Sequence, residues 1–198
     1  MKERPINPRG ELPREVRVIG GTWKRSKLPV LDRPGLRPTP DRVRETLFNW
    51  LGQNLAGWRC VDAFAGTGAL GFEAASRGAA EVVLLERDAA LVESLRASKE
   101  RLKADAVRVE RSDALQWLSR APAASFDLVF LDPPFDAPLL APALQSVARI
   151  VVPGGFVYAE AGAAIEEGAL PGIGLEAYRA GRAGAVHFQL LRRPAAGQ

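Results

Sequence analysis

Short runs of apolar residues alternate with longer stretches of helical periodicity from residue 59 to residue 160. We expect the apolar runs to be strands: RCVDAF (59–64), EVVLLE (81–86), AVRVER (106–111), FDLVFLD (126–132) and GGFVYAE (154–160). Helices are expected between them, near residues 69–77, 88–103, 113–120 and 138–149. The repeated order of strand, helix and strand predicts an α/β fold, in which a parallel sheet carries helices on both faces.

Both ends of the chain depart from this alternation. The last two expected strands, near residues 173–180 and 185–193, have no helix between them and should pair as an antiparallel hairpin. Near the start, VRVIGGTWKRSKLPV (16–30) is typical of two short strands around a turn with basic residues. The chain is therefore expected to divide into four parts: a flexible extension (1–15), a basic N-terminal β-hairpin and loop (16–38), the core (39–193) and a tail (194–198).

A helix is expected to begin just after the N-terminal loop. Thr39 can cap its N-terminus, and Pro40 suits the first helical position, where a missing N–H costs nothing. Val43, Leu47 and Trp50 then recur at helical spacing, which predicts the face that packs on the core.

Length and composition limit the classes of protein that this chain can be. With 198 residues, 47% hydrophobic and 25% charged, it fits one globular domain with a substantial core. Its apolar runs are shorter than the roughly 18 residues that a membrane-spanning helix needs, and its charged beginning lacks the apolar segment of a signal peptide. The single cysteine, Cys60, cannot form an internal disulfide, so a cytoplasmic location is expected.

The net charge of +4 is unevenly distributed. Residues 1–44 hold twelve Lys and Arg against five Asp and Glu, which leaves the remaining 154 residues with a charge of −3. A basic segment on a slightly acidic body is typical of a protein that contacts a polyanion from one side. The alternative is a solvated segment that only favours solubility.

Four polar residues mark the ends of the expected parallel strands: Asp62, Glu86, Arg111 and Asp132. Ligands of parallel α/β sheets bind beyond the carboxyl ends of the strands. We therefore expect the binding site at this edge of the sheet.

The loop after the first of these strands carries a glycine motif. VDAFAGTGALG (61–71) contains Gly66-x-Gly68-x-x-Gly71, the spacing of the dinucleotide fingerprint. Glu86 follows 20 residues after Gly66, where that fingerprint places an acid for a ribose hydroxyl. The pattern alone therefore leaves a nicotinamide-dependent oxidoreductase open.

The charge of Asp62 favours a different cofactor. A pyrophosphate needs backbone N–H groups without nearby negative charge, whereas Asp62 stands four residues before the first glycine. S-adenosylmethionine has no phosphate and carries a sulfonium and an ammonium, which a carboxylate attracts. Glu86 would still accept from the two ribose hydroxyls. Asp113 is placed to accept from the adenine amine and Ala114 N–H to donate to the ring, while Arg87 can pack over the adenine. The structural alternatives are solvated strand-end acids and, for Asp113, a helix N-cap.

The fourth expected strand ends in DPPF, residues 132–135. The exocyclic amine of a nucleobase is a poor nucleophile, so transfer to it requires an aligned lone pair and acceptors for its N–H groups. Asp132 supplies one acceptor and the carbonyl of Pro133 a second, while Pro133 and Pro134 hold the turn rigid and contribute no competing donor. Phe135 offers a ring on which the base can stack.

With these residues in hand, the chain resembles the RsmD family of bacterial 16S rRNA guanine-N2 methyltransferases. The resemblance extends from about Val16 to Arg193 and rests on RVIGGTWKRSKLPV, GLRPTPDRVRETLFNWL, CVDAFAGTGALGFEAASRGA, LLERD and VFLDPPF. The first two segments are the more specific, because many amino-methyltransferases share the last three.

The resemblance implies a Rossmann-like class I methyltransferase fold, with a mostly parallel seven-stranded sheet, a C-terminal antiparallel hairpin and a small N-terminal β-hairpin. It implies S-adenosylmethionine-dependent methylation of one guanine amine in 16S rRNA, within the 30S subunit or an assembly intermediate. It places Asp132, Pro133, Pro134 and Phe135 at the target base. It places the segment Asp62 to Gly68 and Glu86 at the cofactor. Together with the residues inferred above, the cofactor-binding candidates are Thr39, Asp62, Phe64, Ala65, Gly66, Gly68, Glu86, Arg87, Asp113 and Ala114.

Basic residues of the N-terminal segment are the candidates for RNA binding: Arg17, Lys24, Arg25, Lys27, Arg37 and Arg42. Those at the hairpin turn could bind phosphates, and Trp23 could either stack on a base or pack under the hairpin. Thr39 and Arg42 could serve the methionine end of the cofactor or the RNA.

Three other functions remain open. The DPPF chemistry serves adenine N6 and glutamine amides as well as guanine N2, since a carboxylate accepts from each of these amines. A nicotinamide-dependent oxidoreductase would bind NADH instead. A non-catalytic ribosome assembly factor with this fold would not need Asp132.

The remaining reactive residues are assigned structural roles. His187, the only histidine, lies in a strand pattern, and Cys60 lies in a buried strand, so neither a metal site nor a nucleophilic cysteine is expected. Glu160 ends the fifth strand and either lines the site or is solvated.

Overall fold

The computed structural model describes residues 14–33, 36, 38–135 and 137–195. Three predictions fall outside these residues: the extension up to residue 13, the RNA-binding candidate Arg37 and the tail from residue 196. Within the described ranges, no helix combines the length and apolar character needed to cross a membrane.

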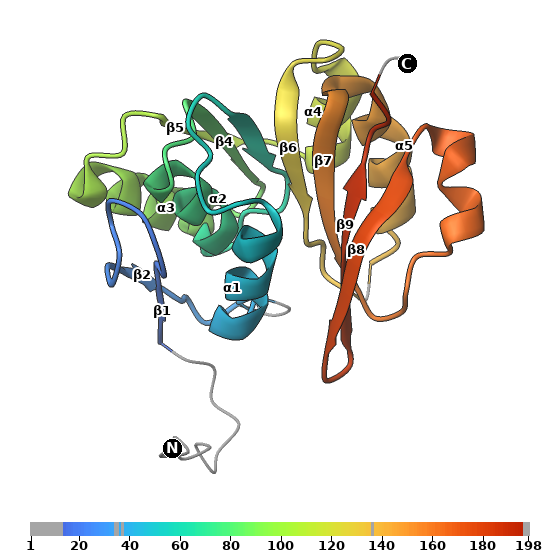
Figure 1. Cartoon of the computed structure of the whole chain (residues 1–198). Helices are drawn as coiled ribbons and strands as arrows, with labels where there is room; N and C mark the ends of the chain where they lie inside the picture. Colours follow the sequence, from blue (N-terminus) through green and yellow to red (C-terminus); the bar gives the residue numbers. More distant parts are fainter. Residues whose placement is uncertain (1–13, 34–35, 37, 136, 196–198) are drawn as a thin grey trace.

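Seven strands form the central sheet, in the order β5-β4-β3-β6-β7-β9-β8 (Figure 1). Neighbours among the first five strands of this order run parallel, whereas β9 runs antiparallel to both β7 and β8. The mostly parallel sheet and its C-terminal hairpin are therefore confirmed. The strands are β3 (Arg59–Asp62), β4 (Glu81–Glu86), β5 (Val107–Arg111), β6 (Phe126–Leu131), β7 (Val151–Ala161), β8 (Glu176–Ala183) and β9 (Val186–Arg192).

Helices cover both faces of the sheet, as parallel sheets require. One buried cluster packs the N-terminal segment, α1, α2 and α3 against one face, and a second cluster packs α4 and α5 against the other. The helices are α1 (Asp41–Trp50), α2 (Ala69–Ser76), α3 (Ala89–Leu102), α4 (Ala114–Arg120) and α5 (Leu140–Ile150), with two 3-10 turns, η1 (Glu167–Ala169) and η2 (Pro171–Ile173).

Two local predictions are wrong. Pro40, not Thr39, is the N-cap of α1, which begins at Asp41 without a side-chain cap. The Thr39 hydroxyl donates instead to Oδ2 of Asp132, at 3.2 Å. The last hairpin begins at Glu176 rather than near residue 173, because η2 occupies the preceding turn.

The N-terminal hairpin is confirmed as an antiparallel pair, β1 (Glu15–Arg17) and β2 (Lys27–Pro29). The chain between these strands lies against the C-terminal end of α2. Thr22 N–H donates to the Ser76 carbonyl at 2.7 Å, and Trp23 N–H donates to Ser76 Oγ at 2.9 Å. The Trp23 ring packs against the core cluster, which favours its structural role over base stacking.

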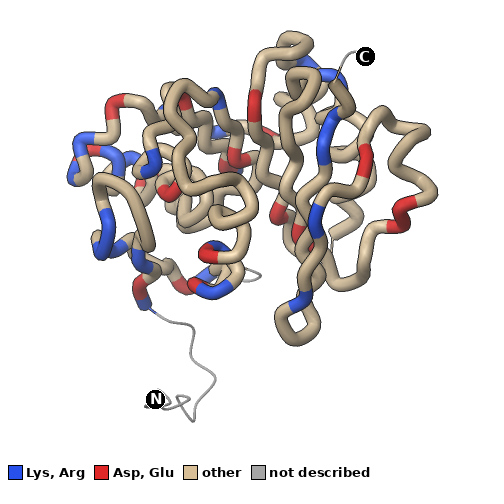
Figure 2. The backbone as a smooth tube through the Cα atoms, in the orientation of Figure 1, with Lys and Arg blue, Asp and Glu red and all other residues tan. Residues whose placement is uncertain are grey.

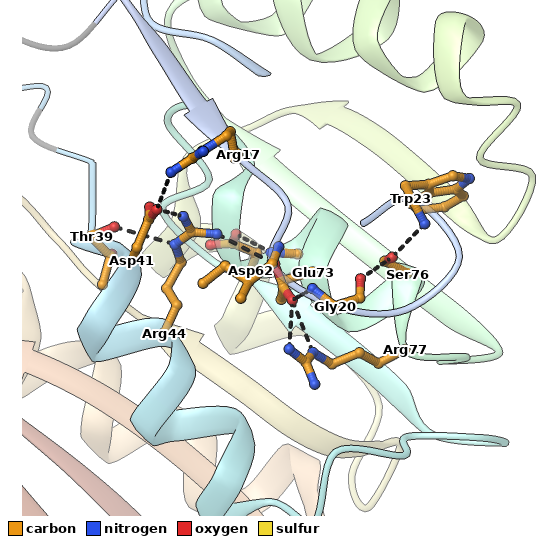
Figure 3. A network of polar contacts seen from close by, with 12 residues as sticks. Arg17, Gly20, Trp23, Thr39, Asp41, Arg44, Asp62, Glu73, Ser76 and Arg77 are labelled. Carbon is orange, nitrogen blue, oxygen red and sulfur yellow. Dashed lines mark hydrogen bonds and ion pairs between the residues drawn. The ribbon is translucent and has the colours of Figure 1, made fainter. Parts of the chain in front are cut away.

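The carboxylate of Glu73 on α2 is the centre of this docking (Figure 3). Its two oxygens accept from the N–H groups of Ile19 and Gly20, each at 2.7 Å. Two guanidinium groups approach the same carboxylate, Arg77 at 2.8 Å and Arg44 at 3.4 Å. Glu73 and Arg44 are fully buried, so each compensates a charge that water does not reach.

Removing the charge of Glu73 should destabilise the fold more than a surface substitution does. In Glu73→Gln, the new NH2 group would face N–H donors, and Arg44 would lose a buried counter-charge. We expect the free energy of unfolding in urea to fall by about 3–5 kcal/mol. Glu93→Gln on α3 is the matched control, because the Glu93 side chain is 72% exposed and pairs with Arg96 at the surface. Equal losses in the two variants would contradict the anchoring role of Glu73.

Candidate active site

A cavity of about 540 Å³ lies at the carboxyl ends of the five parallel strands. Gly68 is not among its lining residues: a Cβ there would lie 2.7 Å from Leu95 Cδ2 on α3 and 2.7 Å from Phe72 Cδ2 on α2, so this position faces the two helices. The other candidates for the cofactor and the target base all line this cavity: Thr39, Asp62, Phe64, Ala65, Gly66, Glu86, Arg87, Asp113, Ala114, Asp132, Pro133, Pro134 and Phe135.

The glycine motif has separate steric roles at its three positions. Gly66 and Gly68 have φ of +52° and +77°, a backbone region that other residues rarely adopt. A Cβ on Gly71 would lie 2.1 Å from Leu84 Cδ2 and 3.3 Å from Oδ2 of Asp62. The first two glycines therefore shape the loop beside the cavity, whereas the third lets α2 pack closely on the sheet.

Asp62 is a buried carboxylate with one unpartnered oxygen. Its Oδ2 accepts from Gly71 N–H at 3.0 Å, whereas its buried Oδ1 has no hydrogen-bond partner among the described residues. Burial raises the pKa of Asp62 to about 7, and the charge of Glu86 adds to this shift while the Gly71 N–H opposes it. The shift acts against folding: the unfolded carboxyl ionises near 3.8, so stability falls as pH rises from there to about 7. A cation beside Asp62 would relieve this cost.

Glu86 is held by three backbone amides. Its Oε2 accepts from Gly66 N–H at 3.1 Å, and its Oε1 accepts from Arg87 N–H at 2.8 Å and Asp88 N–H at 2.9 Å. These bonds orient the carboxylate at the cavity and leave lone pairs for further donors. The hydroxyls of a ribose fit this acceptor.

Asp113 adopts the alternative role that the sequence leaves open. It is the N-cap of α4, and its Oδ1 accepts from Gln116 N–H at 2.9 Å. Because it also lines the cavity, its second oxygen remains for a ligand. Arg87 is exposed at the cavity wall, with no ion pair to a described residue.

Three carboxylates share one face of the sheet. Asp62 on β3 is in register with Phe130 on β6, which is in register with Tyr158 on β7. Side chains alternate between the faces of a strand, so Asp132 and Glu160, two positions beyond Phe130 and Tyr158, lie on the face of Asp62. All three acids line the cavity.

Asp132 and Glu160 both have raised pKa values. Burial is the largest cause of both pKa shifts, and the charges of Glu160 and Asp62 also raise the pKa of Asp132. Tyr158 donates its hydroxyl to Oε1 of Glu160 at 2.8 Å, which opposes the shift there. Glu160 is 3% exposed, so it lines the site and is not a solvated strand-end acid.

Sequence reasoning missed the contribution of Tyr158. The available signal was its spacing: Tyr158 and Glu160 are two residues apart in a strand, which places both side chains on one face. That spacing becomes informative only when the neighbouring strand is known.

The turn after β6 combines a buried proline with an exposed ring. Pro133 is buried, whereas Phe135 is 46% exposed, the one exposed large hydrophobic side chain in the described part of the chain. An exposed aromatic ring at the mouth of a cavity suits stacking against a planar ligand.

The other reactive residues take structural roles. Burial raises the pKa of the Cys60 thiol, so its thiolate is disfavoured, and His187 pairs with Ala161 within the sheet. Among the described residues, no group of three His, Cys, Asp or Glu side chains is arranged to hold a metal ion.

The basic residues of the N-terminal segment differ in their partners. Arg17 pairs with Asp41 at 3.4 Å, and Lys27 pairs with Glu15 at 2.6 Å. Figure 2 shows further cations along β8 and β9, well away from the N-terminal hairpin. The RNA-binding candidates that are exposed and make no ion pair with another described residue are Lys24, Arg25 and Arg42.

Comparison with known proteins gives close relatives over most of the chain. The family model described as Conserved hypothetical protein 95 matches residues 16–192. Ribosomal RNA small subunit methyltransferase D of Escherichia coli K12 is 41% identical over 189 residues, covering 93% of this chain and 93% of that protein. The protein of the same name from Haemophilus influenzae is 42% identical over 151 residues, covering 74% of this chain and 78% of its own.

Two solved structures share the fold. The yhhF structure from Escherichia coli matches with a TM-score of 0.78 at 38% identity, covering 92% of this chain and 99% of its own. HI0767 from Haemophilus influenzae matches with a TM-score of 0.76 at 34% identity, covering 91% of this chain and 99% of its own. Together with the strand order, these neighbours show the class I methyltransferase fold that the family resemblance implies.

The family model spans nearly the whole chain, and a curated relative above 40% identity covers almost all of it. The resemblance drawn from the sequence is thereby confirmed: the chain belongs to the RsmD family.

Proposed function

We propose that this protein transfers a methyl group from S-adenosylmethionine to the exocyclic N2 amine of a guanine in bacterial 16S rRNA. The observation that carries the proposal is that Asp62 and Asp132, at the ends of paired strands β3 and β6, face one cavity. Asp62 suits a cationic methyl donor, and Asp132 suits an amine that accepts the methyl group. The names of the curated relatives, ribosomal RNA small subunit methyltransferase D, support rRNA as the substrate.

The walls of the cavity fit the cofactor in charge and hydrogen bonding. The unpartnered Oδ1 of Asp62 suits a positive group, and Glu86 suits the two ribose hydroxyls. Asp113 and Ala114 N–H are the candidates for the adenine edge, with Arg87 beside it. When bound, this cofactor supplies an activated methyl group on a sulfonium. A dinucleotide fits less well, because its pyrophosphate would lie among buried acids.

The turn after β6 holds the amine that accepts the methyl group. Asp132 and the Pro133 carbonyl accept from its two N–H groups, which turns the lone pair toward the cofactor side of the cavity. The same acceptors stabilise the positive charge that develops on the nitrogen. Phe135 stacks on the base, and the nitrogen is acidic after transfer, so Asp132 or water can take its proton.

Small-subunit particles from a strain that lacks this gene test the proposal directly. With tritiated S-adenosylmethionine, we expect methyl transfer to their rRNA and N2-methylguanosine on nucleoside analysis. Asp132→Ala should lower turnover by roughly 100-fold or more while leaving cofactor affinity within about threefold of the wild type. N6-methyladenosine, or label in a protein, would overturn the guanine assignment. Full biological function with Asp132→Ala would indicate a non-catalytic assembly factor.

Replacing Asp62 should weaken cofactor binding and reduce its pH dependence. Because the pKa of Asp62 is raised to about 7, its carboxyl is mostly protonated at pH 6 and mostly ionised at pH 8. Calorimetry should therefore show tighter binding of S-adenosylmethionine at pH 8 than at pH 6. Asp62→Asn should bind S-adenosylmethionine roughly tenfold more weakly than the wild type at pH 8, and its affinity should rise less between pH 6 and pH 8. Asp105→Asn, at an exposed position, should follow the wild type. An unchanged pH profile in Asp62→Asn would contradict the contact.

Removing the positive charges at the turn of the N-terminal hairpin should weaken RNA binding. Lys24→Gln with Arg25→Gln removes two exposed cations, and the slope of log affinity against log salt should flatten by about 1.5 if both contact phosphates. Lys103→Gln with Arg120→Gln removes the same charge from the C-cap of α3 and from the end of α4, and serves as the matched control. Equal slopes in the two double variants would show that the hairpin turn is not an RNA contact.

A further inference from the structure

Asp132 by itself does not distinguish guanine from adenine. Both bases carry an exocyclic NH2 group, and a carboxylate accepts from either. The bases differ at the adjacent ring atom, because N1 of guanine carries a hydrogen whereas N1 of adenine has a lone pair. A second carboxylate beside Asp132 would therefore accept from guanine and repel adenine.

Glu160 occupies the position next to Asp132. Leu131 on β6 is in register with Ala159 on β7, so each acid is the residue that follows one member of this pair. Neighbouring strands lie about 4.8 Å apart, so two carboxyl side chains that follow adjacent strands can both reach the edge of one base. Glu160 and Asp132 line the same cavity, together with the exposed ring of Phe135.

The surroundings of Glu160 hold its carboxylate in place. The buried Tyr158 hydroxyl donates to Oε1 at 2.8 Å, which leaves Oε2 as the oxygen that Tyr158 does not engage. The Thr39 hydroxyl, which donates to Asp132, also borders Glu160. A hydroxyl has one proton to donate, so the two acids together keep acceptor capacity that Thr39 does not satisfy.

On the basis of the function proposed above, we propose that Glu160 is a specificity-determining residue that accepts the N1–H of the target guanine while Asp132 accepts from its N2 amine. The two carboxylates then match the donor–donor edge of guanine. At the same position, adenine would place the N1 lone pair against an anion. An unpaired, desolvated acceptor in this site costs much more than one lost hydrogen bond, so the discrimination is large.

An analogue that keeps the amine and loses the N1 hydrogen isolates this contact. 2-Aminopurine carries the 2-amino group of guanine, but its N1 is an acceptor. The probes are small subunits reconstituted with guanosine or 2-aminopurine riboside at the position that nucleoside mapping identifies. The wild type should methylate the guanosine particle at least about 100-fold faster than the analogue.

Glu160→Gln should reduce this ratio at least about tenfold, because a glutamine amide can accept from N1–H or donate to an N1 lone pair. Loss of the guanine O6 affects both enzymes alike, so the change in the ratio reports on N1. Glu167→Gln, on the exposed turn η1, is the matched control and should keep the wild-type ratio. Calorimetric affinity for S-adenosylmethionine and the melting temperature report whether each variant is folded.

A second variant covers the case in which Glu160→Gln does not fold. Tyr158→Phe keeps the charge of Glu160 and removes the hydroxyl that orients it, so the ratio should fall in the same direction by a smaller factor. The experiment distinguishes failure of the proposed function from failure of the specificity role of Glu160. A wild type that forms no N2-methylguanosine overturns the proposed function, whereas N2-methylguanosine formation with unchanged ratios in the folded variants overturns the role of Glu160 alone.

Discussion

The buried ion pair between Arg44 on α1 and Glu73 on α2 is the contact on which the arrangement of the cavity depends. Neither side chain is exposed, and a buried charge without its partner costs several kcal/mol, so the two helices cannot shift independently. Arg44 Nε also donates to the Thr39 carbonyl, at 3.3 Å. Because the hydroxyl of Thr39 donates to Asp132, a short chain of polar contacts runs from the centre of the N-terminal docking site to the carboxylate at the end of β6.

The N-terminal hairpin is therefore part of the active-site structure rather than an appendage. The carboxylate that pairs with Arg44 also accepts from the backbone of Ile19 and Gly20, at the start of the segment that leads to the exposed cations Lys24 and Arg25. A substrate phosphate held at that turn would be held by the same rigid unit that carries Thr39. Binding and chemistry can then be aligned without a large movement of one part of the protein relative to another, which reduces the entropy cost of orienting a large substrate.

The sequence predicts the features that depend on local interactions better than those that depend on contacts between residues distant in the chain. Strand and helix periodicity is local, and it placed the core elements within a few residues. The acids at the strand ends were found for a related reason, since parallel strands bring their carboxyl ends to one edge. The roles of Glu73 and Arg44 were not found, because each looks like an ordinary charged helix residue until helices distant in sequence are packed together. Thr39 was assigned to a cap for the same reason: a threonine before a helix can bond locally or reach across the fold, and only tertiary structure selects Asp132.

The acids of the cavity explain why a glycine motif of the dinucleotide type occurs here beside a different ligand chemistry. Asp62, Asp132 and Glu160 lie on one face of three adjacent strands, and burial raises the pKa of each. Three such groups repel one another and weaken the ligand-free fold above their ordinary ionisation range. A phosphate would add to that repulsion, whereas a cation at Asp62 and N–H donors at the other two would relieve it. The glycines allow the backbone to approach a nucleoside closely, and the carboxylates favour a nucleoside that carries a positive charge.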